Sequence, residues 1–166
     1  MYGCIKLFKK CHINRRKKAL TYNKPKKRDL YNLLLENPRL HIVYGLRGGR
    51  KITLLFQRFL DYPEGKHIYI SGDGIKLLKI SLMDVFRDLY YVLDGGAIFI
   101  EEINSIDGWV EELKVAYDSY SNWYIYVSGS SSLNLLESKK VLARRARYYH
   151  LLPMTFREYI KITRDV

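Results

Sequence analysis

The residues best suited to chemistry follow three short apolar runs, and the first group is the glycine-rich turn GLRGGRKIT at residues 45–53. It comes close to the phosphate-binding pattern G-x-x-x-x-G-K-[ST], in which backbone amides surround phosphates, the lysine pairs with them and the hydroxyl holds Mg²⁺. Arg50 stands where the pattern has glycine, and its Cβ should crowd the anion. Ile52 stands where the pattern has a hydroxyl. Thr53 is a poor substitute, because it lies about 100° further round the helix.

An apolar run precedes this turn and a helical pattern follows it, as in a phosphate-binding loop between a strand and a helix. The amino terminus of that helix offers unpaired backbone amides and the positive end of the helix dipole. A glycine-rich turn with a chance lysine is the alternative interpretation. The predicted cofactor-binding residues are Gly45, Arg47, Gly48, Gly49, Arg50, Lys51, Ile52 and Thr53.

The second group is a pair of carboxylates, Glu101 and Glu102, directly after the apolar run AIFI. Enzymes with a phosphate-binding loop place an acid at such a strand end to orient Mg²⁺. In many of them a following glutamate deprotonates the attacking water. Glu101 is therefore the predicted metal acid and Glu102 the predicted catalytic base. Aspartate is the usual first acid, and Mg²⁺ demands near-ideal geometry, so the longer Glu101 weakens the predicted metal site. Solvated acids at a strand end are the alternative.

The third group is the serine-rich segment VSGSSS at residues 127–132, after another apolar run. Ser128, Ser130, Ser131 and Ser132 crowd this strand end with hydroxyls, and in a nucleotide site a polar side chain here senses the terminal phosphate or holds the attacking water. A polar loop that caps a helix is the alternative interpretation.

The elements that must position these groups alternate between strand and helix. Non-alternating apolar strands indicate a parallel sheet covered on both faces, with ligands beyond the carboxyl ends of the strands. We therefore predict an α/β fold of three layers with a mainly parallel five-stranded sheet flanked by helices. The predicted strands are 40–44, 67–71, 97–101, 123–128 and 147–152. The predicted helices are 29–37, 51–60, 81–93, 105–120 and 155–160, and Ser81 with Asp84 comes close to a capping box.

The net charge of +12 is unevenly distributed. Residues 1–28 contain 11 of the 29 Lys and Arg and none of the 17 Asp and Glu, so the other 138 residues are nearly neutral. Such a run is typical of a solvated, mobile tail (1–27) or of a polyanion-binding segment such as one for nucleic acid. Cys4, Cys11 and His12 fall short of a closed zinc site, and we expect free thiols. No run approaches the roughly 20 apolar residues of a membrane span, so a cytoplasmic location is expected.

Four segments together resemble prokaryotic, largely archaeal, AAA-type ATPases of the P-loop NTPase superfamily. They are ENPRLHIVYGLRGGRKITLL, IFIEEINSIDGWVEELKVAYD, YVSGSSSLNLL and YYHLLPMTFREYI, in that order within residues 28–163. The LLPMTFREY segment and the Gly108-Trp109 pair are far more specific than the loop alone.

The resemblance implies ATP and Mg²⁺ as cofactors, with Lys51 on the phosphates, Glu101 on the metal and Glu102 as catalytic glutamate. It places Ser130 at the sensor position. It also implies that Arg145 reaches a phosphate in its own or a neighbouring subunit, which makes a homo-oligomer one expected assembly. Relatives have glycine at Arg144, and they continue into a lid and a C-terminal domain, so 28–166 is expected to be a core lacking both.

Three functions follow from these residues. The favoured one is an ATP-binding AAA-type core whose hydrolysis is weak or lost through the altered loop and acid. The second is an active ATPase that tolerates Arg50 and Glu101. The third is a non-enzymatic nucleic-acid- or protein-interaction module that uses the basic tail on a P-loop scaffold.

Overall fold

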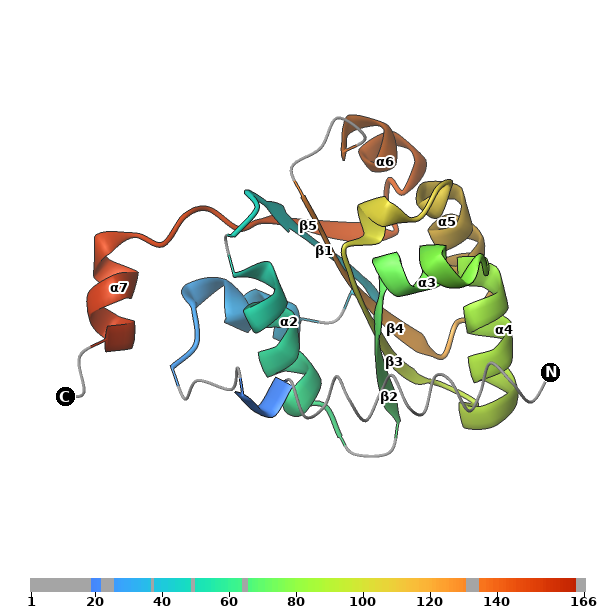
Figure 1. Ribbon diagram of the computed structural model, residues 1–166, viewed down its shortest axis with the longest axis horizontal. Helices are drawn as coiled ribbons and strands as arrows, with labels where there is room; N and C mark the ends of the chain where they lie inside the picture. Colours follow the sequence, from blue (N-terminus) through green and yellow to red (C-terminus); the bar gives the residue numbers. More distant parts are fainter. Residues whose placement is uncertain are drawn as a thin grey trace.

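The computed structural model describes residues 19–21, 26–36, 38–48, 50–63, 66–130 and 135–163. Its centre is a parallel five-stranded sheet with the strand order β2-β3-β4-β1-β5 (Figure 1). The strands are β1 Leu40–Gly45, β2 His67–Ser71, β3 Gly96–Glu101, β4 Trp123–Ser130 and β5 Ala146–His150. The predicted α/β fold with a parallel five-stranded sheet is confirmed.

Helices connect the strands, and their bounds differ in places from the prediction. The α-helices are α2 Lys51–Leu60, α3 Gly72–Leu78, α4 Leu82–Leu93, α5 Trp109–Ser119, α6 Leu135–Val141 and α7 Phe156–Thr163. Two 3₁₀ helices are η1 Asp29–Leu35 and η2 Ile103–Ser105, and η1 lies where an α-helix was predicted. The helices α3 and α6 were not predicted. Each has only seven residues, and α3 begins on Gly72, a poor helix former.

Local sequence signals explain two helix starts. Ser81 and Asp84 form the reciprocal bonds of a capping box before α4, as predicted. Gly108 has a positive φ of 70° at the start of α5, a conformation that costs glycine little. The next residue, Trp109, is buried, so the Gly108-Trp109 pair turns the chain and anchors the helix.

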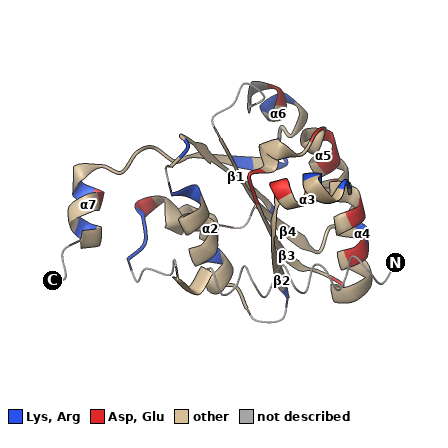
Figure 2. Cartoon of the chain, viewed as in Figure 1, with Lys and Arg blue, Asp and Glu red and all other residues tan. Residues whose placement is uncertain are grey.

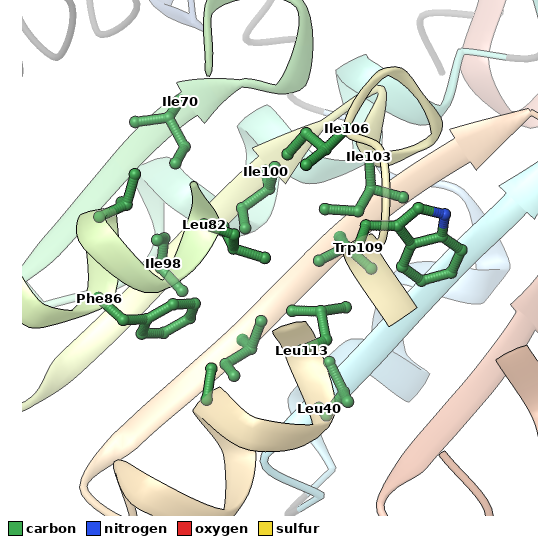
Figure 3. Packing of buried hydrophobic residues seen from close by; sticks show 14 of the residues in the cluster. Leu40, Ile70, Leu82, Phe86, Ile98, Ile100, Ile103, Ile106, Trp109 and Leu113 are labelled. Carbon is green, nitrogen blue, oxygen red and sulfur yellow. The ribbon is translucent and has the colours of Figure 1, made fainter. Parts of the chain in front are cut away.

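Alternate residues of each strand enter two separate cores. On one face, Ile98 and Ile100 of β3 pack with residues of α4 and α5, such as Phe86 and Leu113 (Figure 3). On the other face, α2 and η1 cover the sheet, and Phe99 belongs to this second core. The sheet is therefore the middle of three layers, which explains its continuous apolar strands.

One aromatic ring from every strand lines the α2 face of the sheet. The row is Tyr69, Phe99, Tyr126, His41 and Tyr149, with neighbouring ring centroids 4.5–6.3 Å apart. Stacked rings at these separations stabilise beyond their buried area. Among the described helices, none is both long and apolar enough to cross a lipid bilayer.

Candidate functional site

The carboxyl ends of the parallel strands bring the predicted groups to one edge of the sheet. Gly45, the last residue of β1, pairs with Ser130 of β4. On the other side of β4 lies β3, which ends at Glu101. The glycine-rich turn, the serine segment and the two carboxylates therefore meet at this edge, which we call the carboxyl edge.

Close packing explains the first glycine of the turn. A Cβ on Gly45 would lie 2.3 Å from the carbonyl oxygen of Leu151, so only glycine fits. The amide of Leu151 donates to the carbonyl of Tyr44 at 2.7 Å. The start of the LLPMTFREY segment thus rests directly on the turn. Gly48 has a positive φ of 82°, which favours glycine, and Gly49 lies outside the described residues.

Arg50 occupies the left-handed region, with φ 60° and ψ 28°, immediately before α2. Glycine adopts this conformation without the Cβ clash that other residues meet there. The structure therefore gives the physical reason why the pattern has glycine at this position. The exposed side chain of Arg50 lines a surface pocket together with Arg47, Gly48, Pro153 and Met154, and Arg47 is likewise exposed.

Lys51 is folded back into the turn. Its Nζ donates to the carbonyl of Gly45 at 3.0 Å and to that of Leu46 at 2.9 Å, and the residue is only 4% exposed. Burial lowers the pKa of Lys51, while the negative charge of Glu102 acts in the opposite direction.

The next two residues of α2, Ile52 and Thr53, pack against other parts of the chain. Ile52 packs against the core on the α2 face. Thr53 lines a pocket with Leu54, Met154 and Ile162. That Thr53 is a poor substitute for the missing hydroxyl stays a prediction.

The two glutamates differ in their surroundings. Glu101 is 4% exposed, and Oε2 accepts a hydrogen bond from the hydroxyl of Tyr69 at 3.1 Å. Glu102 is half-buried and left-handed, with φ 51°. A Cβ on Gly72 would lie 2.3 Å from the Glu102 carbonyl oxygen, so this glycine lets α3 approach the glutamates. Sequence reasoning missed Tyr69 and Gly72, because only the pairing of β2 with β3 brings them here.

The serines of β4 have two environments. Ser130 is half-buried at the carboxyl edge, beside the start of the glycine-rich turn. Ser128 is fully buried, and its Oγ has no hydrogen-bond partner within the described part of the chain. Ser131 and Ser132 lie outside the described residues.

Arg145 does not join the carboxyl edge. It precedes β5, whose first residue, Ala146, pairs with Leu40, the first residue of β1. Five strand steps of about 3.3 Å separate that end from the turn, roughly 16 Å. Arg145 forms a bidentate pair with Asp118 at 2.8 and 3.0 Å. Arg145 therefore lies beside the amino ends of the strands, and its expected contact with a phosphate, in its own or a neighbouring subunit, stays a prediction.

The neighbouring Arg144 has a φ of 66°, in the left-handed region. Glycine, expected there from the resemblance, would adopt this conformation without strain. Arg144, at the amino ends of the strands, is thus a second arginine in a left-handed position where glycine is expected, like Arg50.

Sequence reasoning also missed an ion pair that fixes α7. Arg28 donates to both carboxylate oxygens of Glu158 at 3.1 and 2.8 Å and to the carbonyl of Leu152 at 3.0 Å. The Arg28 guanidinium holds the pKa of Glu158 below its usual range. Glu158 also forms a capping box with Thr155. The LLPMTFREY segment thus joins the turn to the chain that precedes η1.

Part of the expected tail belongs to this core. Ala19 is fully buried in the cluster on the α2 face, and Lys27 pairs with Asp61. The carbonyl of Lys26 accepts a hydrogen bond from Gln57 at 3.3 Å. These contacts lie on the tail side of the boundary expected at residue 28. Residues 1–18 are outside the described part.

Comparisons with known proteins agree with this architecture. The model of the AAA_14 family, described as an AAA domain, matches residues 37–160. Two uncharacterized proteins of Methanocaldococcus jannaschii, MJ1637 and MJ1544, are 38% and 31% identical over 165 and 150 residues. Each match covers 87% of this chain but only 34% and 32% of the relative, so the chain spans about a third of their length. Among solved structures, AMPPCP-bound DnaA from Aquifex aeolicus shares the fold, with a TM-score of 0.52 and 16% identity over 81% of this chain and 47% of DnaA.

Proposed function

The chain belongs to the AAA_14 family of AAA domains, and from that membership and the carboxyl-edge geometry we propose that it binds ATP and hydrolyses it weakly or not at all. The single observation that carries the proposal is the pairing of Gly45, whose carbonyl accepts a hydrogen bond from Lys51, with Ser130 at the end of β4, beside the strand β3 that leads into Glu102. The related fold of DnaA, in a structure that contains AMPPCP, supports a nucleotide as the ligand.

Each of these residues has a proposed role at the carboxyl edge. Lys51 leaves the carbonyls of Gly45 and Leu46 and pairs with phosphate oxygens, whose full negative charge makes the interaction stronger than one with a neutral carbonyl. Ser130, next to the turn, contacts the terminal phosphate or the attacking water. Glu102 accepts the proton of that water.

Weak hydrolysis follows from the residues that replace the usual ones. Removal of a single transition-state contact commonly lowers the rate by about 10²–10³. Arg50 places a side chain where the loop has none, and Ile52 contributes no oxygen. Two such changes in one loop suffice to suppress turnover while the remaining amides still hold phosphates.

Thermal denaturation with ATP tests binding. A ligand at 100 times its dissociation constant stabilises the folded state by about 2.7 kcal/mol, or roughly 5–10 °C for a chain of this size. Lys51→Ala should abolish the shift, and Lys66→Ala, at the opposite end of β2, is the matched control. An equal shift for Lys51→Ala and the native chain would count against the proposed site.

Turnover separates weak hydrolysis from none. Phosphate release by the native chain is compared with that of Glu102→Gln, which removes the proposed base but keeps the size of the side chain. A rate that is measurable in the native chain and lost in Glu102→Gln assigns the base. Equal rates in both chains reject Glu102 as the base.

An interaction module is the second candidate, because seven of the basic residues lie within residues 1–18 and no acidic residue accompanies them. Affinity for DNA or RNA should then fall steeply with salt. Since Ala19, Lys26, Lys27 and Arg28 contact the core, the deletion that tests it removes residues 1–18 only. Unchanged affinity after this deletion rejects the tail as the binding segment.

A further inference from the structure

The fold family implies Mg²⁺ with the nucleotide, but the donors at the carboxyl edge do not fit this ion. Mg²⁺ prefers hard oxygen ligands in near-ideal octahedral geometry. The hydroxyl that a phosphate-binding loop provides is absent, since Ile52 packs into the core. Thr53 lines the pocket that also contains Met154 and Ile162.

The acid at the end of β3 is also engaged elsewhere. Glu101 is nearly fully buried, and its carboxylate is bonded to the Tyr69 hydroxyl at 3.1 Å. Tyr69 itself is fully buried, and its ring lies against those of Phe56 and Phe59, at centroid distances of 4.5 and 5.4 Å. The loop therefore lacks one expected ligand, and the other expected ligand is a buried carboxylate with one oxygen hydrogen-bonded to a neighbouring strand.

Positive charge is instead supplied by the chain. Lys and Arg gather at the turn before α2 and at its first residues (Figure 2). Arg47 and Arg50 are exposed and line one pocket with Gly48 of the turn. Neither guanidinium has an ion-pair or hydrogen-bond partner among the residues that the structure describes. Arg28 lines the same pocket but is occupied by Glu158.

We propose that this site binds the nucleotide triphosphate without Mg²⁺, and that the guanidinium of Arg50, assisted by Arg47, provides the charge that the metal provides elsewhere. A guanidinium suits this role, because its planar donors match phosphate oxygens in a bidentate manner. The inference rests on the proposed function, since it requires that the triphosphate binds at the turn. It also gives a reason for an arginine in a left-handed position that glycine would fill more easily.

Calorimetric titration of the full chain with ATP tests the inference, once in excess EDTA and once in MgCl₂ at equal ionic strength. The dissociation constant in EDTA should be equal to or lower than that in MgCl₂. Arg50→Asn should weaken binding in EDTA about tenfold, as expected for the loss of a charged hydrogen bond. Asparagine is the chosen replacement because it tolerates the left-handed conformation.

The chain contains a matched control for this variant. Arg144→Asn makes the same change of charge at a φ of 66°, close to the 60° of Arg50, but at the opposite edge of the sheet. Its affinity for ATP in EDTA should equal that of the native chain. The double variant Ile52→Thr with Tyr69→Phe restores the loop hydroxyl and removes the hydrogen bond from Tyr69 to Glu101, and Mg²⁺ should then strengthen binding.

The outcomes separate this inference from the proposed function. Binding in MgCl₂ but not in EDTA overturns metal independence and leaves the ATP-binding proposal in place. Absence of binding under both conditions overturns the proposed function and this inference with it. Metal-free binding that Arg50→Asn does not weaken rejects the assigned role of Arg50.

Discussion

Mild acid should destabilise this protein through one buried histidine. His41 in β1 is fully buried between the rings of Tyr126 and Tyr149, at centroid distances of 4.5 and 5.6 Å. Burial lowers the pKa of His41 to about 4, against the action of the Pro38 carbonyl, which raises it, while the charges of Arg58 and Arg147 lower it further.

The sign and size of the effect follow from this pKa. Between pH 6.5 and 4 the unfolded chain binds a proton at His41 and the folded chain does not, so the free energy of unfolding falls as the pH falls. The drop approaches 1.4 kcal/mol per pH unit, or about 3 kcal/mol over the window. Full stability from this residue is present above pH 6.5. Domains of this kind have total stabilities of about 5–15 kcal/mol, so the loss is measurable.

Urea denaturation at pH 7.5, 6.5, 5.5 and 4.5, at constant ionic strength, measures this dependence. His41→Phe keeps an aromatic ring in the row but cannot bind a proton, and Tyr149 retains its hydrogen bond to the Leu33 carbonyl at 3.1 Å. The variant should lose most of the slope between pH 6.5 and 4.5. Carboxylates with lowered pKa values, such as Asp61, act at lower pH and contribute to both chains alike. If the free energy of unfolding changes with pH in the same way for the native chain and for His41→Phe, the reasoning is refuted.

Three further predictions concern the carboxyl edge and the segment that rests on it. Glu158→Gln leaves the Arg28 guanidinium without a charged partner in a mostly buried site, so the free energy of unfolding, measured by urea titration, should fall by about 3 kcal/mol. A loss below about 1 kcal/mol contradicts a structural role for the pair. Gly45→Ala forces a Cβ against the Leu151 carbonyl and should lower the free energy of unfolding by about 2–3 kcal/mol in the same measurement. Gly48→Ala is the control for backbone strain alone, because a Cβ at Gly48 meets no atom within 4 Å. Arg50→Gly removes the strain of an arginine in the left-handed region, and the greater freedom of glycine in the unfolded chain offsets part of this gain. The midpoint of thermal unfolding should therefore stay unchanged or rise, and a clear decrease contradicts the strain argument.

The sequence by itself determined the layered architecture and brought the candidate residues to one end of the sheet. Apolar strands alternating with helical patterns require a parallel sheet, and parallel strands place their carboxyl ends at one edge. Gly45, Ser130 and Glu101 are each at or next to the end of a strand, so their proximity follows from topology alone. The same rule explains Arg145, because a residue that precedes a parallel strand lies at the opposite edge.

Only the tertiary structure decided what these residues contact. Nothing in the local sequence shows that Tyr69 bonds Glu101, that Leu151 rests on Gly45, or that Arg28 pairs with Glu158. The partners are separated by 32, 106 and 130 positions, and contacts across such separations leave no periodic pattern in the chain. Periodicity reports which face of an element is buried, whereas strand order and loop packing select the neighbour that each buried group meets.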